Sequence, residues 1–280
     1  MNPYTLSDDD LETMLRGDAP LGDLTSFGLG IAGSRGRMLF SARDPMTVCG
    51  VEEARRMGEL RGLMVSGPAP ESGTQLEAGA PILGFEGDAA ILHTVWKTAQ
   101  TLIEALSGIA TATTELVRLA APSARVACTR KHFPGAKAAF LKAVLCAGAS
   151  AHRHGLSETV LVFPEHLVFT DDAAPGAVVA RLAAANPEKR LVVEVTSVDA
   201  AIAWADAGAD VLQLEKFSPE AVAEVVARTR PRPRPPVVAA AGGIHRGNAA
   251  DYARAGARVL VTSAPYQATP RDVQVRFERA

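Results

Sequence analysis

Six apolar segments in the second half of the chain alternate with helix-like segments, and this alternation most constrains the fold. The apolar segments read RVAC, TVLVF, RLVVEV, DVLQL, PPVVAAA and RVLVTS, and helical patterns separate them at 136–147, 174–185, 198–207, 218–229 and 247–255. Repeated strand–helix units predict parallel strands joined by right-handed crossovers. Strands that are apolar on both faces favour a barrel or a doubly wound sheet. A complete (β/α)8 barrel needs eight strands, so we expect an incomplete (β/α) barrel, with an open sheet as the alternative.

The first part of the chain predicts a separate α+β domain. Ser7 before DDDLETMLRG predicts a capped helix that ends at Gly17. The β-like pieces RGRMLFSA and APILGFEG flank GVEEARRMGELRG, which reads as a helix, and residues 88–121 predict one or two further helices. We therefore place an N-terminal α/β sandwich domain with its leading helix at 1–107. The barrel domain follows at 108–280, and its last residues can pack back on the N-terminal domain.

Composition excludes several classes of protein. The 280 residues carry a formal net charge of -2, whereas proteins that bind nucleic acids normally carry a large positive excess. No apolar run approaches the roughly 18 residues that a membrane span needs, and the acidic N-terminus lacks a signal-peptide core. Cys49, Cys128 and Cys146 are widely spaced and odd in number, which indicates reduced cysteines. We expect a cytoplasmic protein that binds neither nucleic acid nor membrane.

Polar residues follow every strand of the expected barrel. In parallel α/β folds the functional groups gather at the carboxyl ends of the strands, so these residues should meet on one rim. The successive strand ends carry Thr129-Arg130-Lys131-His132, Phe163-Pro164-Glu165-His166, Glu194 with Thr196-Ser197, Gln213 with Glu215-Lys216, Gly242-Gly243, and Thr262-Ser263.

The glycine pair in AAAGGIHRGN suggests a phosphate site. Glycines let backbone N–H groups approach a ligand closely, and a helix start carries partial positive charge. Barrels often hold phosphate at their last two strand ends, which here are Gly242-Gly243 and Thr262-Ser263. The alternative is a tight turn that needs positive φ.

The remaining rim residues suit an activated sugar and an anionic or aromatic acceptor. Arg130 offers a planar fork for a carboxylate or phosphate, and Lys131 offers a point charge. Glu194 and Glu215 can hold Mg²⁺ through water, bind ribose hydroxyls or stabilise an oxocarbenium-like centre. Each carboxylate could instead be a salt-bridge partner.

The segment TRKHFPGAKAAFLKAVLCAGASAHRHGL, residues 129–156, resembles the core motif of the quinolinate phosphoribosyltransferase family. That motif runs Thr-Arg-Lys, Pro-Gly, then His-Arg-x-Gly-Leu, and the spacing matches without a gap. GDLTS at 22–26, SGIATAT at 107–113, VEV at 193–195 and AGGI at 241–244 fall in the family order. TRKHFPG and GLSETVLVFPEH further resemble the ModD-like branch, which is named as a pyrophosphorylase and associated with molybdenum-transport operons.

The resemblance implies an N-terminal sandwich, an incomplete barrel and a homodimer, or a higher homo-oligomer, in which one subunit's N-terminal domain closes the other's barrel. The family joins a pyridine dicarboxylate to phosphoribosyl pyrophosphate, with loss of pyrophosphate and CO₂ and with Mg²⁺ required. From the resemblance we expect catalytic roles for Lys131, Glu194 and Glu215, with Mg²⁺ held through water by Glu194 and Glu215. Contacts with the acceptor or substrate are expected from Thr129, Arg130, His152, Arg153 and Phe163. A phosphate cradle is expected at Gly242, Gly243, Thr262 and Ser263.

The chain departs from the family at the acceptor. Phe163 replaces a substrate-binding lysine, and Ala105 replaces an arginine that reaches the partner subunit's acceptor site. Each charge-assisted contact contributes about 1.5–3 kcal/mol, so losing two would weaken quinolinate binding by several powers of ten. Other departures are Trp96-Lys97 for Glu-Arg, Ala241 for Ser, Glu215 for Asp and Ala147-Gly148-Ala149 for a glycine triplet.

Several functions therefore compete. The first is phosphoribosyl transfer to an aromatic or carboxylated acceptor other than quinolinate. The second is authentic quinolinate phosphoribosyl transfer in NAD biosynthesis, with the missing cations supplied by Lys97, His132 or Lys142. The third is a non-catalytic protein that binds oxyanions such as molybdate, against which Glu194 and Glu215 argue. A Schiff-base aldolase using Lys131 and a metal site made of histidines, His132, His152, His154 and His166, are weaker alternatives.

Overall fold

The computed structural model describes residues 6–280, which divide into two compact units. Unit 1 contains residues 6–114, 132–148 and 265–280, and unit 2 contains residues 115–131 and 149–264. Helix α4 (Ala89–Ala120) is continuous over 32 residues, so the 88–121 stretch forms one helix rather than two. The computed structure holds no helix in its described part that is long and apolar enough to cross a membrane.

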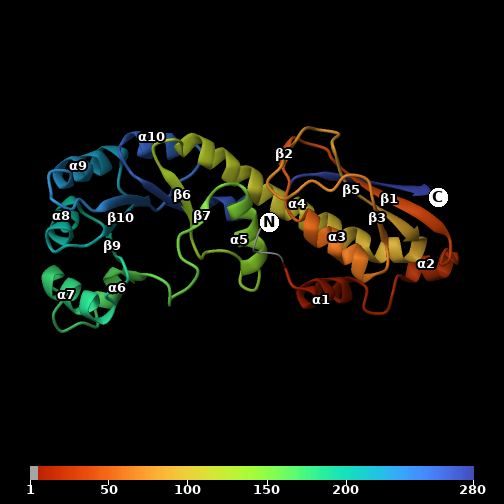
Figure 1. The fold of residues 1–280 in the computed structure, drawn as a ribbon, viewed down its shortest axis with the longest axis horizontal. Coiled ribbons are helices and arrows are strands. Elements are labelled where there is room, and N and C mark those ends of the chain that lie inside the picture. Colours follow the sequence, from red (N-terminus) through yellow and green to blue (C-terminus); the bar gives the residue numbers. More distant parts are fainter. Residues whose placement is uncertain (1–5) are drawn as a thin grey trace. The chain divides into compact units, whose positions relative to one another are not determined.

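An antiparallel sheet forms the framework of unit 1 (Figure 1). Its strand order is β13 (Val273–Arg279), β1 (Arg35–Ala42), β5 (Pro81–Asp88), β3 (Met64–Ser66). Side chains of β1 alternate between exposed and buried, as a strand with one face on a core requires. Phe40 on this buried face meets Phe85 of β5 edge-on, with ring centroids 6.1 Å apart. The final strand β13 pairs with β1 along its whole length.

The helices of unit 1 follow the local signals in the sequence. Ser7 caps α1 (Asp8–Asp18) in a capping box with Asp10, and the helix ends one residue beyond the expected Gly17. The other elements of this unit are α2 (Leu24–Leu29), β2 (Met46–Thr47), α3 (Val51–Leu60), β4 (Gln75–Leu76), α5 (Lys137–Cys146) and the 3₁₀ helix η1 (Ala264–Gln267), which begins at the boundary with unit 2.

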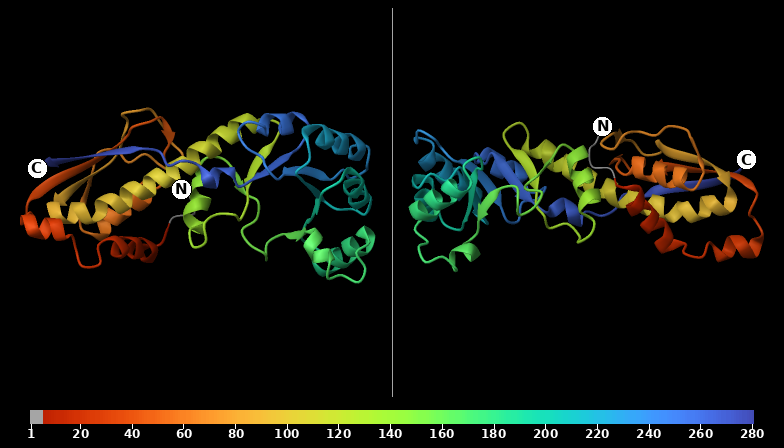
Figure 2. Two further views of the ribbon diagram at one scale, coloured as in Figure 1. Left: turned by 180° about the vertical axis from the view of Figure 1, so that it is seen from behind. Right: turned by 60° about the horizontal axis from the view of Figure 1, so that its bottom comes forward.

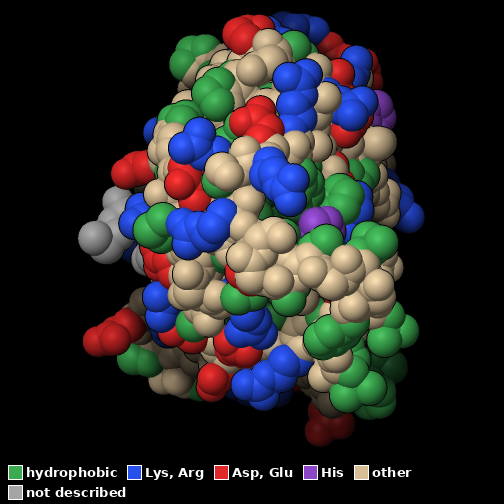
Figure 3. Space-filling model, turned by 90° about the vertical axis from the view of Figure 1, so that its right-hand side faces the viewer, with side chains coloured by type: hydrophobic (Ala, Val, Ile, Leu, Met, Phe, Trp, Pro, Cys, Tyr) green, Lys and Arg blue, Asp and Glu red, His purple; other side chains and the backbone are tan. Residues whose placement is uncertain are grey.

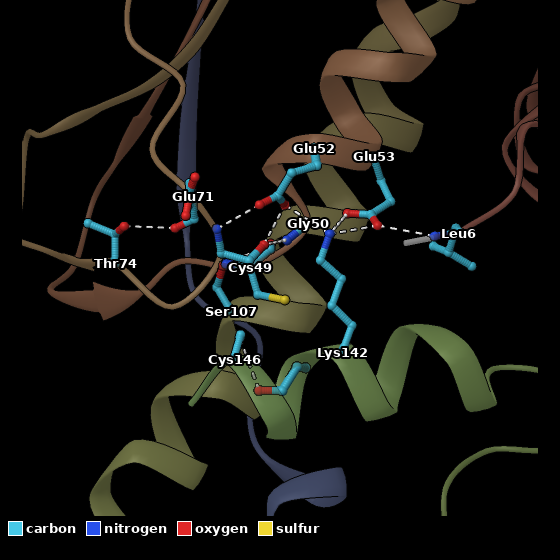
Figure 4. Close-up of polar contacts among 12 residues, drawn as sticks. Leu6, Cys49, Gly50, Glu52, Glu53, Glu71, Thr74, Ser107, Lys142 and Cys146 are labelled. Carbon is cyan, nitrogen blue, oxygen red and sulfur yellow. Dashed lines mark hydrogen bonds and ion pairs between the residues drawn. The ribbon is translucent and has the colours of Figure 1, made fainter. Parts of the chain in front are cut away.

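A buried ion-pair cluster joins α5 to α3 inside unit 1 (Figure 4). The Lys142 ammonium is fully buried and lies 2.5 and 2.7 Å from the two carboxylate oxygens of Glu53 and 2.9 Å from Glu52. Burial lowers the pKa of Lys142, but the two carboxylates outweigh burial and the net pKa is raised. Lys142 therefore stays protonated, and its charge is balanced by Glu52 and Glu53 within unit 1.

Unit 2 is an open half-barrel of parallel strands, as the strand–helix alternation predicts (Figures 1 and 2). All six expected strands form, and a two-residue strand, β7, joins the sheet beside β6. The sheet order is β7 (Ser150–Ala151), β6 (Arg125–Cys128), β12 (Val259–Thr262), β11 (Val237–Ala241), β10 (Val211–Glu215), β9 (Leu191–Val195), β8 (Val160–Val162).

Helices α7 to α10 pack against the outside of this sheet (Figure 2). The helices of unit 2 are α6 (Pro164–Leu167), α7 (Pro175–Ala185), α8 (Val198–Asp206), α9 (Pro219–Thr229) and α10 (Ala249–Arg254). On the inside, Gln213 of β10 is in register with Glu194 of β9 and Ala239 of β11. The small side chains of Ala239 and Ala241 leave room for these polar groups.

Candidate active site

A cavity of about 340 Å³ opens at the carboxyl ends of the half-barrel strands in unit 2. Because the strands are parallel, residues that follow them in sequence meet at one edge. All twelve residues to which the sequence assigned a role in the site line this cavity: Thr129, Arg130, Lys131, His152, Arg153, Phe163, Glu194, Glu215, Gly242, Gly243, Thr262 and Ser263. Other strand-end residues expected on the same rim do not line it: His132, His166, Thr196, Ser197 and Lys216. Leu161, Glu165, Gln213, Ala241 and Val261 complete the lining.

Glu194 is held by a neighbour on the next strand. The amide Nε2 of Gln213 donates a hydrogen bond to Glu194 Oε2 at 2.6 Å. Gln213 is only 5% exposed, and its Oε1 is buried without a hydrogen-bond partner among residues 6–280. Burial, followed by the charges of Glu215 and Glu165, raises the pKa of the Glu194 carboxyl although the Gln213 hydrogen bond lowers it. The sequence placed Gln213 at a strand end but did not reveal this pairing.

Glu215 lies against Gly242, the first residue of the glycine pair. A Cβ atom on Gly242 would approach Glu215 Oε1 to 2.6 Å, and Gly242 has a φ of 79°. Only glycine adopts this conformation freely and leaves space for the carboxylate. The next residue along the chain after β10, Lys216, also has a positive φ, 59°, and its N–H donates to the Ala241 carbonyl at 2.8 Å. This hydrogen bond between the ends of β10 and β11 holds Glu215 beside Gly242.

The second glycine faces open space. Gly243 has a φ of 78°, and no atom lies within 4 Å of the position that a Cβ would take. The Thr262 hydroxyl donates to the Ile244 carbonyl at 2.7 Å and accepts from the Ala264 N–H at 3.0 Å, so it ties the two last strand ends together. Helix α10 begins only at Ala249. The helix expected at 247–255 is thus confirmed to within two residues at its start. A turn separates Gly243 from this start, so the backbone N–H groups of the turn are the ones available to a phosphate at the glycine pair.

Cationic and imidazole groups also line the cavity. Arg153 is 7% exposed, and burial followed by the charge of Arg130 lowers its pKa. Burial and the charge of Arg153 lower the pKa of His152 as well. Lys131, in contrast, is exposed. Its N–H is bonded to the Thr129 hydroxyl at 3.1 Å. A buried Arg153 guanidinium beside the charge of the exposed Arg130 favours an anionic ligand.

Phe163 makes this part of the cavity aromatic. Its ring stacks on His166, with centroids 5.7 Å apart and an interplanar angle of 23°. The Arg153 guanidinium carbon lies 5.6 Å from the Phe163 centroid, within the range of a cation–π contact. The residue that replaces the family's lysine therefore contributes a flat apolar surface.

The cations considered as substitutes lie elsewhere. Lys142 is paired with Glu52 and Glu53 inside unit 1. Lys97 donates to Gln100 and lies over Trp96, and the His132 ring contacts Phe140 and Tyr266. None of the three lines the cavity of unit 2.

The weaker chemical alternatives gain no support from the described residues. A Schiff-base lysine is activated by desolvation or by a second cation, whereas Lys131 is exposed. Within residues 6–280 no group of three or more His, Cys, Asp or Glu side chains could hold a metal directly. Mg²⁺, however, keeps several waters and is usually held by one or two carboxylates together with phosphate oxygens. The Glu194 and Glu215 carboxylates fit that kind of site.

Two family models match consecutive parts of the chain. The model of the quinolinate phosphoribosyl transferase N-terminal domain matches residues 23–107. The model of the C-terminal domain of the same enzyme matches residues 109–276. Together they cover most of the chain, and the resemblance inferred from the central motif is confirmed.

Individual relatives show which branch of the family the chain is most similar to among those compared. ModD of Rhodobacter capsulatus, named as a pyrophosphorylase, is 46% identical over 258 residues, which span 91% of this chain and 99% of that protein. ModD of Pasteurella multocida is 34% identical over 278 residues, 98% of both chains. The nicotinate-nucleotide pyrophosphorylase from Francisella tularensis superposes with a TM-score of 0.88 at 24% identity, covering 98% of both chains. This last likeness shows the fold, and the first two bear out the ModD-like branch.

Proposed function

Because the chain belongs to the quinolinate phosphoribosyltransferase family and is a phosphoribosyltransferase of its ModD-like branch, we propose a reaction of that kind. In this reaction the phosphoribosyl group of phosphoribosyl pyrophosphate is transferred to an aromatic acid other than quinolinate. The observation that carries the proposal is the common cavity of the twelve strand-end residues. The half that suits the sugar phosphate keeps Lys131, Glu194 and the glycine pair of the family and has a carboxylate, Glu215, at the position of the family's aspartate. The half that suits the acceptor has lost cations.

The chemistry follows from the charges around the cavity. Pyrophosphate leaves carbon 1 of the pentose with the bonding electron pair, and a lone pair of the acceptor forms the new bond to that carbon. The pentose becomes oxocarbenium-like between these events, and the Glu194 and Glu215 carboxylates stabilise its positive charge. Lys131 faces the phosphoryl oxygens, and the N–H groups of the turn at Gly242 and Gly243 bind the 5′-phosphate. Glu194 and Glu215 would hold Mg²⁺ through water, and the bound ion would supply positive charge to the departing pyrophosphate.

The acceptor half favours one carboxylate rather than two. Arg130, His152 and Arg153 remain to bind an acid, but Phe163 offers a ring face in place of an ammonium group. A dicarboxylate such as quinolinate would have to balance two charges in a partly desolvated site without the ammonium group of the family's lysine, which is unfavourable. An aromatic monocarboxylate can stack on Phe163 and pair with one guanidinium group.

The test measures pyrophosphate release from phosphoribosyl pyrophosphate and Mg²⁺ with quinolinate, nicotinate and purine or pyrimidine bases as acceptors. We expect turnover with an aromatic monoacid and little with quinolinate, and Lys131→Ala and Glu194→Ala should each abolish turnover. Quinolinate turnover at the rates typical of enzymes would instead support quinolinate phosphoribosyl transfer in NAD biosynthesis. Tight molybdate binding without binding of phosphoribosyl pyrophosphate would support an oxyanion-binding protein.

We also propose that the protein is a cytoplasmic homodimer. Three described cysteines are free, as in reducing compartments. Four apolar side chains at or just before α2 are 67–87% exposed: Leu21, Leu24, Phe27 and Leu29. Figure 3 views the molecule from the end formed by unit 1 and shows a group of apolar side chains at its lower right. Contiguous exposed apolar surface commonly marks a protein interface, and a second copy is the partner that the family relationship supports.

A further inference from the structure

A second cavity of about 400 Å³ lies in unit 2 beside the candidate active site. Strand β8, the segment before it and helices α6 and α7 form its walls. Its lining is mainly apolar and includes Leu156, Val160, Leu167, Val178 and Leu182. The phosphoribosyl chemistry described above uses none of these five residues.

The two cavities share a wall. Arg153 and Leu161 line both of them. Phe163 lines the first cavity, and His166, on which its ring is stacked, lines the second. A ligand bound against Arg153 and Phe163 therefore lies next to residues that also form the lining of the second cavity.

The charges of the second cavity indicate the chemistry of its occupant. Among the residues that the structure describes, its lining contains Arg153, Arg181 and His166 but no aspartate or glutamate. The first cavity, in contrast, is lined by carboxylates as well as by cations. An apolar chamber with cationic groups and no carboxylate suits an anion that carries an apolar body.

We propose that the second cavity binds an apolar extension of the acceptor, so that the acceptor is an aromatic monocarboxylic acid larger than a single pyridine ring. The carboxylate pairs with Arg153 at the shared wall, the reacting ring stacks on Phe163, and the extension lies among Leu156, Val178 and Leu182. This inference rests on the proposed phosphoribosyl transfer, and it identifies the class of acceptor that the altered half of the site takes.

The test compares nicotinate with 5-phenylnicotinate and 6-phenylnicotinate as probes. Binding of each probe is measured by titration calorimetry in the presence of Mg²⁺, and binding of phosphoribosyl pyrophosphate is measured separately. For the wild-type protein we expect at least one phenylnicotinate to bind tenfold or more tightly than nicotinate. Two variants fill the cavity: Val178→Trp at a buried wall position, and Leu156→Trp at a position that is 73% exposed and therefore compatible with folding.

Both variants should lose the preference for the phenylnicotinates while phosphoribosyl pyrophosphate binds as before. The matched control is Val168→Trp, because Val168 is 77% exposed but lies outside the lining, and it should keep the preference. If phosphoribosyl pyrophosphate binds normally but the phenylnicotinates bind no better than nicotinate, the inference is wrong and the proposed function stands. If Leu156→Trp folds and keeps the preference, the inference is also wrong. If the wild-type protein does not bind phosphoribosyl pyrophosphate, both the proposed function and this inference are wrong.

Discussion

Gln213 and Glu194 face each other across strands β10 and β9, and the Gln213 amide nitrogen donates to the Glu194 carboxylate at 2.6 Å. The Gln213 carbonyl oxygen is buried without a partner among the described residues. An unsatisfied buried acceptor costs about 1–3 kcal/mol, so this side chain is not placed for stability alone. The hydrogen bond from Gln213 orients the Glu194 carboxylate, which we place beside the reacting carbon of the pentose.

Replacing Gln213 by Leu should therefore impair catalysis more than binding. A hydrogen bond to a charged group contributes about 1.5–3 kcal/mol, which corresponds to a loss of kcat of roughly 10- to 150-fold. Without the amide donor the pKa of Glu194 rises further, so the acid limb of the pH–rate profile should move to higher pH. An unchanged acid limb, with only a lower melting temperature, would reduce Gln213 to a structural role.

Replacing Glu194 by Gln should stabilise the protein at neutral pH. Burial, then Glu215 and Glu165, hold the pKa of Glu194 above its ordinary value. A raised carboxyl pKa favours folding below the unfolded pKa, about 4.3, and this contribution is lost as pH rises through the folded pKa. The melting temperature of Glu194→Gln relative to wild type should thus be higher at pH 7.5 than at pH 4.5. The control is Glu188→Gln, because Glu188 is exposed and lies outside the cavity lining. An equal pH trend in both variants would refute this cause.

Gly242→Ala and Gly243→Ala form a matched pair. Both residues have positive φ, so alanine costs about 1–2 kcal/mol at either position. Only at Gly242 does the added methyl group also displace the Glu215 carboxylate. Thermal unfolding should show a loss in both variants, larger in Gly242→Ala because of the contacts with Glu215 and Lys216. Turnover should fall at least about tenfold further in Gly242→Ala, as a displaced catalytic group predicts. Equal turnover in the two variants would show that the position of Glu215 is not critical.

Lys142→Met should strongly destabilise unit 1. Removing one partner of a buried ion pair typically costs about 3–5 kcal/mol because the other charge remains buried, and Glu53 is fully buried here. Denaturant unfolding should show this loss, and the double variant Lys142→Met with Glu53→Gln should recover part of it. Exposed Lys137→Met on the same helix is the control and should change stability by no more than about 0.5 kcal/mol. A loss of similar size in both single variants would contradict the role of the cluster.

The exposed apolar group at α2 should govern self-association. Leu24→Glu with Phe27→Glu places charges on side chains that are 82% and 67% exposed, so folding should be retained. We expect light scattering after gel filtration to show a dimer for wild type and a monomer for this variant. A monomeric wild-type protein, or a dimeric variant, would contradict an interface at α2.

The sequence predicts the half-barrel and its rim because both depend on local patterns. Apolar segments such as DVLQL identify strands, and the parallel arrangement brings the residues at their carboxyl ends, including Lys131 and Glu215, to one edge. Strand β7 was missed because two residues, Ser150–Ala151, give no periodic signal.

Relations that depend on strand register or tertiary packing were not predictable. The pairing of Gln213 with Glu194 requires the register of β10 against β9. Lys216 at positive φ carries no sequence signal, because lysine has no preference for that conformation. The burial of Lys142 between Glu52 and Glu53 joins segments 89 residues apart in the chain, which no local pattern reveals.

A crystal structure of the protein with phosphoribosyl pyrophosphate and Mg²⁺ is the most direct test of the central claim. We expect the 5′-phosphate against the backbone of Gly242 and Gly243, carbon 1 of the pentose beside Glu194 and Glu215, and free space between that carbon and Phe163. A sugar phosphate bound elsewhere, or a pentose turned away from both glutamates, would contradict the account.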